Sequence, residues 1–176
     1  MSDDQALSGH VSSALRCRHM TQSGDVETVE RTIPAAPEAI FALLADPSRH
    51  HDIDGSGTVR EAKHAPERVE LGDTFGMDMK RGVPYSTHNV VIEFDDNRCI
   101  AWQHAATGVI GSIVGPGAIW RYELESVEGG TKVHETWDFS PVRGFKPMLR
   151  LARARRDTRS GMEKTLENIE KLLASS

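Results

Sequence analysis

The sequence predicts an α+β protein in which a curved antiparallel sheet of about seven strands wraps around one long C-terminal helix. Three observations lead to this prediction. Short segments between residues 57 and 139 alternate apolar and polar side chains, which is the period of half-buried strands. Turn sequences join consecutive segments, so neighbouring strands should run antiparallel. Residues 147–173 carry apolar side chains at helical spacing, and only this helix is long enough to cover the apolar face of the sheet.

The N-terminal part of the predicted domain is one strand followed by two short helices. The strand covers residues 26–33, and Pro37 suits the first turn of a helix, where its missing N–H leaves no hydrogen bond unmade. Asp46 precedes a proline and should therefore end that helix. Ser48 is placed to cap a second helix over residues 49–53.

Six further strands follow these helices. Turn sequences at residues 95–98 and 128–130 predict two hairpins. Within the segment of residues 88–94, Val90, Ile92 and Phe94 recur at every second position, so they are predicted to share the buried face of the strand. The predicted strands cover residues 58–62, 74–80, 88–94, 99–104, 118–127 and 131–139.

The chain of 176 residues suits a single domain, which we place at residues 25–176. Residues 1–24 are polar and show no apolar periodicity, so they are predicted to be a disordered tail, with Met20 as an alternative start. The net charge is −5, so the chain lacks the overall positive charge typical of nucleic-acid-binding proteins, and nucleic-acid binding is not expected. No apolar run approaches the roughly 18 residues of a membrane span.

The two cysteines, Cys17 and Cys99, form neither a disulfide framework nor a CxxC site. The N-terminus lacks the apolar stretch of a secretory signal. We therefore expect a reducing, cytoplasmic setting. As partners we expect an apolar small molecule, no nucleic acid and no integral membrane contact, with the chain a monomer or a weak homodimer.

Two sequence runs carry a resemblance to a known superfamily. They are ERTIPAAPEAIFALLADPSRH at residues 30–50 and HETWDF at residues 134–139. Together with the order of the elements, they resemble the START/Bet v 1-like helix-grip proteins, and within these the bacterial polyketide cyclase/dehydrase and lipid-transport (SRPBCC) family. The resemblance implies an apolar cavity between the sheet and the long helix. It does not fix a function, because members include carriers, hormone-type receptors and cyclases.

The inner wall of this expected cavity follows from strand parity. Its aromatic members suit flat, partly oxygenated ligands, although plain core packing is the alternative. Met162 would face it from the long helix. The residues predicted for the strand wall are Phe75, Met77, Met79, Trp102, Trp120, Tyr122 and Trp137.

Two titratable residues are candidates for chemistry. Glu135 shares a parity with Val133 and Trp137, so it should point inward, where a carboxylate is unfavourable unless paired or neutralised. It is then an acid/base or ligand-anchoring group, or else it lies at a rim or beside a structural cation. His104 follows Trp102 on the same parity and is a second acid/base candidate, or a satisfied core histidine.

Arg155 interrupts the apolar stripe of the long helix. It is predicted either to reach into the cavity and meet Glu135 or to lie on a solvated flank. The helix start is rich in arginine over residues 143–159, and weak contact with anionic lipid headgroups is one reading, a solvated face the other.

No cofactor or metal is predicted. The cluster of His50, His51, Asp52 and Asp54 lacks a metal-ligand spacing such as HExxH, and residues 108–117 read as a flexible flap without a phosphate-binding motif. The favoured function is binding of a lipid, polyketide or sterol-like molecule as a carrier. The alternative is a cyclase/dehydratase-type enzyme that uses Glu135 and His104 as acid/base groups.

Overall fold

The computed structural model describes residues 24–105, 116–143, 147, 150 and 152–175. The predicted tail therefore lies outside the described residues except for Gly24, as does most of the predicted flap. The elements, in chain order, are β1 (Val26–Ile33), α1 (Pro37–Ala45), the 3-10 helix η1 (Pro47–Arg49), α2 (His50–Ile53), β2 (Val59–Lys63), β3 (Thr74–Arg81), β4 (Val83–Asp95), β5 (Cys99–Ala105), β6 (Ile119–Val127), β7 (Gly130–Asp138) and α5 (Ala152–Ala174).

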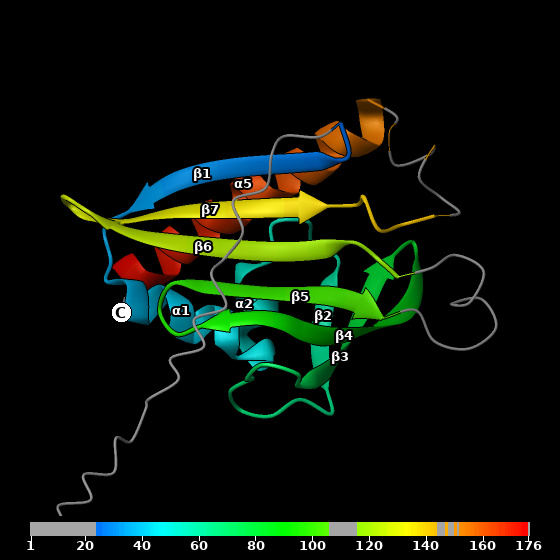
Figure 1. The fold of residues 1–176 in the computed structure, drawn as a ribbon, viewed down its shortest axis with the longest axis horizontal. Helices are drawn as coiled ribbons and strands as arrows, with labels where there is room; N and C mark the ends of the chain where they lie inside the picture. The colour runs from blue at the N-terminus through cyan, green and yellow to red at the C-terminus, as the bar shows by residue number, and fades with distance from the viewer. Residues whose placement is uncertain (1–23, 106–115, 144–146, 148–149, 151, 176) are drawn as a thin grey trace, which may run out of the picture.

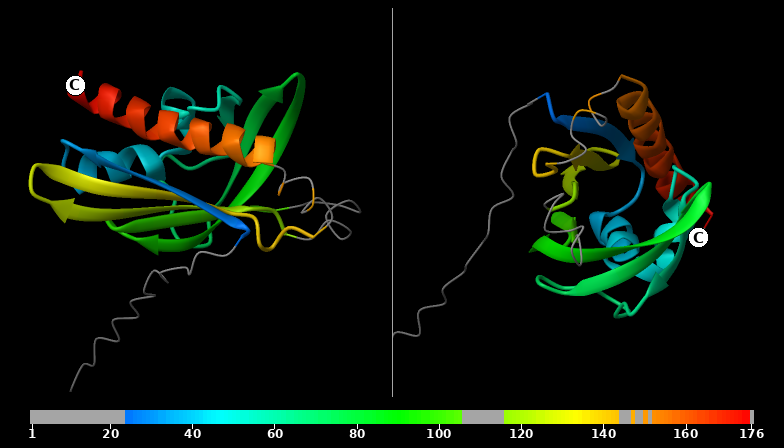
Figure 2. Two further views of the ribbon diagram at one scale, coloured as in Figure 1. Left: turned by 90° about the horizontal axis from the view of Figure 1, so that it is seen from above. Right: turned by 90° about the vertical axis from the view of Figure 1, so that its right-hand side faces the viewer.

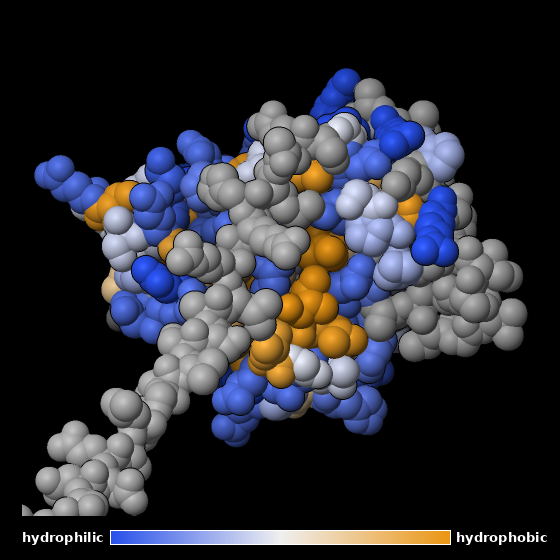
Figure 3. Space-filling model, in the orientation of Figure 1, coloured by the Kyte–Doolittle hydropathy of each residue, from blue (hydrophilic) through white to orange (hydrophobic). Residues whose placement is uncertain are grey.

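The strands form one seven-stranded sheet in the order β1-β7-β6-β5-β4-β3-β2, and every neighbouring pair is antiparallel. The sheet curves around α5, while α1 and α2 lie in the same concavity (Figures 1 and 2). The predicted α+β fold with two short helices after the first strand is confirmed. The outer face is mostly hydrophilic, with an apolar band over the middle of β6, β5 and β4 (Figure 3).

The short helices begin where the chain supplies the capping groups. Pro37 occupies the first turn of α1. Ser48 does not act as the predicted cap, because the Oδ1 atom of Asp46 accepts the backbone N–H of Ser48 at 2.9 Å and caps η1. The second predicted helix is therefore two short pieces, η1 and α2.

Strand β4 departs most from its predicted course. It begins at Val83 rather than residue 88, and its register against β5 shifts between Val91 and Glu93. Such a bulge exchanges the two faces of a strand. Val91 now lies opposite Trp102, and Phe94 opposite Ile100, so Val91 and Phe94 face inward. The predicted inward trio of Val90, Ile92 and Phe94 is wrong for its first two members.

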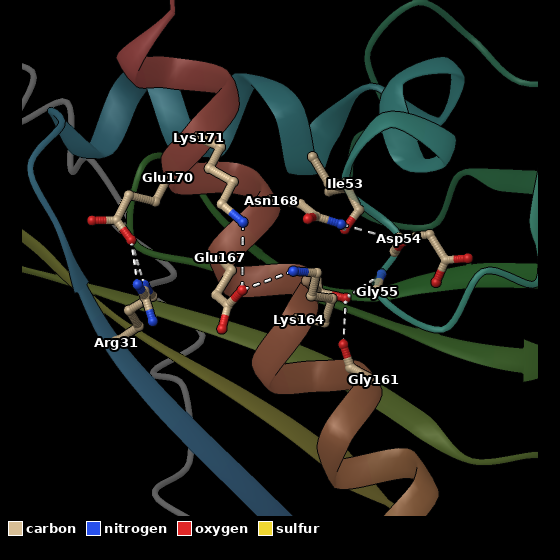
Figure 4. A network of polar contacts seen from close by, with 11 residues as sticks. Arg31, Ile53, Asp54, Gly55, Gly161, Lys164, Glu167, Asn168, Glu170 and Lys171 are labelled. Carbon is tan, nitrogen blue, oxygen red and sulfur yellow. Dashed lines mark hydrogen bonds and ion pairs between the residues drawn. The ribbon is translucent and has the colours of Figure 1, made fainter.

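Helix α5 is held to the sheet edge and to the short helices by different faces. On one side Arg31 of β1 donates to Glu170 at 2.6 Å (Figure 4). On the other, the amide nitrogen of Asn168 donates to the carbonyl of Ile53 at 3.3 Å, and Thr165 accepts the N–H of Gly55 at 3.0 Å. Between them, Met162, Leu166 and Ile169 are buried in the core. The described helix starts at Ala152, later than the predicted Pro147.

Cys99 is buried on β5, and its Sγ atom lies 3.7 Å from the Oε2 atom of Glu93. The other cysteine, Cys17, lies outside the described residues. No described helix is long and apolar enough to cross a membrane.

Truncating Ile169 should reveal how much α5 contributes to stability. The side chain is 0% exposed, so Ile169→Ala is expected to lower the free energy of unfolding by about 2–5 kcal/mol through lost burial and a residual cavity. Ile169→Val removes one methyl group and should cost about 0.5–1.5 kcal/mol. Urea titrations of both variants measure the series, and equal, negligible losses would show that the helix is not packed as described.

Candidate ligand-binding cavity

A cavity of about 930 Å³ lies between the concave face of the sheet and α5. This volume is in the upper part of the range of small-molecule sites, about 300–1,000 Å³. Strands β2 to β7 supply one wall, and α2, the segment after it and α5 supply the other. The predicted residues that line it are Phe75, Met77, Met79, Trp102, His104, Trp120, Tyr122, Glu135, Trp137 and Met162. That they contact a ligand remains a prediction.

The middle of the wall is a row of aromatic rings that crosses the sheet. Trp102 lies opposite Trp120, and Trp120 lies opposite Trp137, so all three side chains project from the same face. Trp102 also stacks between two neighbours, with ring centroids 5.0 Å from His50 and 5.5 Å from Tyr122. Such packing fixes the ring orientations and presents a broad apolar surface.

Glu135 of β7 lies inside this wall and is only 2% exposed. The hydroxyl of Tyr122, directly opposite on β6, donates to its Oε1 atom at 2.9 Å. The Oε2 atom is buried and has no hydrogen-bond partner among the described residues. Glu135 is therefore buried away from the rim of the cavity, and no described arginine or lysine forms an ion pair with it.

Burial controls the protonation of this pair. Loss of hydration raises the pKa of Glu135 to about 8; the Tyr122 hydrogen bond opposes this shift, and the charge of Asp54 adds to it. Burial, followed by the charge of Glu135, also raises the pKa of Tyr122 well above its ordinary value. Near neutral pH both groups therefore hold their protons, so this pair adds no charge to the cavity.

His104 and Asn89 form a second polar position in the cavity. They lie opposite each other on β5 and β4. Burial lowers the pKa of His104 to about 4, so its imidazole is neutral. The amide nitrogen of Asn89 donates to the carbonyl of Phe75 at 3.2 Å, while its Oδ1 atom is buried without a partner among the described residues.

Asn89 and His50 were not singled out as ligand residues by the sequence reasoning. The bulge in β4 hid Asn89, because uninterrupted alternation placed it on the outer face. His50 was weighed only as a metal ligand; instead its Nε2 atom lies 2.9 Å from the carbonyl of Leu44 and its ring forms part of the cavity wall. Burial lowers the pKa of His50. Among the described residues, no three His, Cys, Asp or Glu side chains gather as a metal site.

Arg155 does not reach Glu135, and that expectation is corrected. Its guanidinium forms an ion pair with Glu27 of β1 and donates to the carbonyl of Gly24 at 3.1 Å. Two other arginines near the helix start are also paired: Arg150 with Asp25 at 2.7 Å, and Arg159 with Glu27 at 3.6 Å. These pairs fasten the start of α5 to β1. Lipid contact at this helix start remains a prediction.

The two predicted acid/base groups lie in different parts of the cavity. Glu135 faces Tyr122, which lies opposite Ile100 of β5, whereas His104 is four residues further along the same strand. That spacing corresponds to about 13 Å along the sheet. The two groups therefore do not form a contacting pair.

A curved antiparallel sheet closed over a long helix, with an apolar cavity between them, defines the class of helix-grip ligand-binding proteins. Residues 26–174 match the family described as polyketide cyclase / dehydrase and lipid transport, and the chain belongs to this family.

The chain is also similar to individual proteins. The chain is 33% identical over 147 residues to the uncharacterized protein Rv0088 of Mycobacterium tuberculosis; the match covers 81% of the chain and 60% of that relative. It thus spans about 60% of the length of this relative.

Solved structures share the fold at low identity. Protein NE0264 of Nitrosomonas europaea superimposes with a TM-score of 0.67 at 13% identity, over 88% of this chain and 97% of that one. The Polyketide_cyc-like protein Cgl2372 of Corynebacterium glutamicum gives a TM-score of 0.57 at 22% identity, over 88% and 94% of the two chains.

Proposed function

We propose that this protein binds an apolar small molecule of the lipid, polyketide or sterol-like kind in the cavity and acts as its carrier. The observation that carries the proposal is the combination of an aromatic wall with a buried carboxyl group whose Oε2 atom has no hydrogen-bond partner among the described residues. Apolar walls supply the affinity of such sites, and a few polar groups orient the ligand. A ligand that enters the cavity would supply the partner that this buried oxygen lacks among the described residues.

The enzyme alternative rests on the protonation of Glu135. A carboxylic acid with a pKa of about 8 is suited to donate a proton near neutral pH, as a cyclase or dehydratase requires. His104 is too far away to relay that proton directly. Glu135→Gln separates the two functions: a carrier would keep its affinity, whereas the turnover of an enzyme would fall by roughly 10²-fold while binding persists.

Replacing Trp120 should weaken binding of an apolar dye. Trp120 lines the cavity and is only half-buried, so its removal disturbs the core less than that of Trp102. We expect N-phenyl-naphthylamine to quench tryptophan fluorescence of the wild type, and Trp120→Ala to raise its Kd about tenfold, because an aromatic contact of about 1.4 kcal/mol is lost.

Leu71→Ala is the matched control, because Leu71 is 50% exposed and lies outside the cavity wall. It should leave the Kd unchanged. Failure of the wild type to bind the dye would contradict the proposed function. Native mass spectrometry of protein purified from its own host would identify a ligand that co-purifies.

A further inference from the structure

Two buried oxygen atoms in the cavity have no hydrogen-bond partner among the described residues: Oδ1 of Asn89 and Oε2 of Glu135. Both residues line the cavity, and each is only 2% exposed. An unsatisfied buried polar atom costs about 1–3 kcal/mol, so such atoms are rare unless something else completes them. Each of the two specifies a different partner.

Asn89 specifies a hydrogen-bond donor. Its Nδ2 atom lies 3.2 Å from the carbonyl oxygen of Phe75, which can only accept. Turning the amide around would place two oxygen atoms against each other, so the orientation of the side chain is fixed. The outward atom is therefore Oδ1, and it can pair only with an N–H or O–H group.

Glu135 specifies a hydrogen-bond acceptor. Its Oε1 atom already accepts the hydroxyl of Tyr122 at 2.9 Å, and no described cation contacts the carboxyl group. Burial without a cation favours the neutral acid, in agreement with a pKa of about 8. The proton then resides on Oε2, which can donate to a carbonyl or ether oxygen.

The two positions are separated by the aromatic row. Asn89 of β4 lies opposite His104 of β5. Glu135 of β7 lies opposite Tyr122 of β6, which in turn lies opposite Ile100 of β5, four residues before His104. Trp102 lies between these levels, and its row continues through Trp120. The offset along the strand is about 13 Å, and β4 and β7 are also three strand spacings of about 4.8 Å apart across the curved sheet, so a ligand that reaches both groups must have an elongated body that lies across the aromatic rings.

Resting on the proposed function, we infer that the ligand is an uncharged, elongated molecule with a flat apolar body, a carbonyl-type acceptor that pairs with Glu135 and a hydroxyl-type donor that pairs with Asn89. An anionic headgroup only accepts hydrogen bonds, so it does not supply the donor that Oδ1 of Asn89 requires. One end of the ligand therefore accepts a hydrogen bond from the protein, and the other end donates one.

A set of steroid probes tests this polarity on one rigid body. Dihydrotestosterone carries a ketone at one end and a hydroxyl at the other, androstanedione carries two ketones, and androstane carries neither group. Displacement of bound N-phenyl-naphthylamine measures each affinity. We expect dihydrotestosterone to bind about tenfold more tightly than androstanedione, because only it satisfies both oxygens.

Two variants assign the ends. Asn89→Leu should abolish the preference for dihydrotestosterone over androstanedione, and this ratio does not depend on how much of the variant is folded. Glu135→Gln keeps an N–H donor toward the ketone, so it should retain ketone binding at all pH values. In the wild type the same binding should weaken above about pH 8, where the acid loses its proton.

The outcomes separate the inference from the proposed function. Equal affinity for all three steroids, tightest binding of androstane, or dye binding that no steroid displaces would overturn the polarity or the elongated shape while cavity binding stands. An unchanged ratio in Asn89→Leu would also overturn it. If the wild type binds neither dye nor steroid, the proposed function itself fails.

Discussion

Glu135→Gln is expected to make the protein more stable than the wild type at alkaline pH, by up to on the order of 5 kcal/mol, and to leave it nearly unchanged in acid. The carboxyl group has a pKa of about 8 in the folded protein, against 4.5 for the free group. Each unit of difference corresponds to about 1.4 kcal/mol. Gln has almost the same shape and does not titrate.

The direction follows from proton uptake. Below pH 4.5 both the folded and the unfolded chain hold the proton, so the full stability of the wild type is present. Between 4.5 and 8 the unfolded chain releases the proton while the folded chain keeps it, and stability falls as pH rises. Above about 8 the loss is complete. In Glu135→Gln this fall is absent.

Urea titrations near pH 5, 7 and 9 measure the free energy of unfolding of the wild type and of Glu135→Gln, and so the difference between them. Glu125→Gln is the control: Glu125 is exposed on the neighbouring strand, and its replacement should give a curve parallel to the wild type. If Glu135→Gln also runs parallel to the wild type, the carboxyl group is hydrated and the strand faces the other way.

Strand parity was sufficient to place much of the cavity wall in advance. It succeeded on β7, where an unbroken antiparallel register carries Glu135 and Trp137 to the inner face. It failed on β4, because a bulge is a tertiary feature that leaves the alternation of residue types nearly intact. Asn89 was therefore missed, although it holds one of the two unpaired oxygens.

Helical periodicity left a different ambiguity. It showed that Arg155 interrupts an apolar stripe, but it did not tell whether that position faces the cavity or the sheet edge. The partner of Arg155 is Glu27, and the pairing depends on β1 lying beside β7 at the edge of the sheet. Contacts between segments so distant in sequence follow from topology, and residue patterns alone do not specify them.

The close approach of Gly55 to α5 is another such contact, and it sets the second large expected effect. A Cβ atom at this position would fall on the carbonyl oxygen of Gly161 and the backbone nitrogen of Thr165, and 2.6 Å from the Cβ of Lys164. These are parts of the helix backbone and its first side-chain atoms, so no side-chain rotation can relieve the overlap.

Gly55→Ala should therefore push α5 away from the segment after α2. It would break the hydrogen bond from the Gly55 N–H to Thr165 and widen the cavity at one side. We expect a loss of about 3 kcal/mol or more in the free energy of unfolding, at the upper end of overpacking effects, together with weaker dye binding.

Gly161→Ala is the matched control from the opposite side of the same contact. Its added Cβ would meet Ser56 no closer than 3.5 Å, which is ordinary van der Waals contact. Because alanine is favoured over glycine inside a helix by roughly 0.5–1 kcal/mol, this variant should be as stable as the wild type or slightly more so. Thermal melting of the two single variants measures the asymmetry. Equal melting temperatures would mean that the helix does not rest on Gly55, and the cavity would then lack the closed side that confines a ligand against the aromatic row.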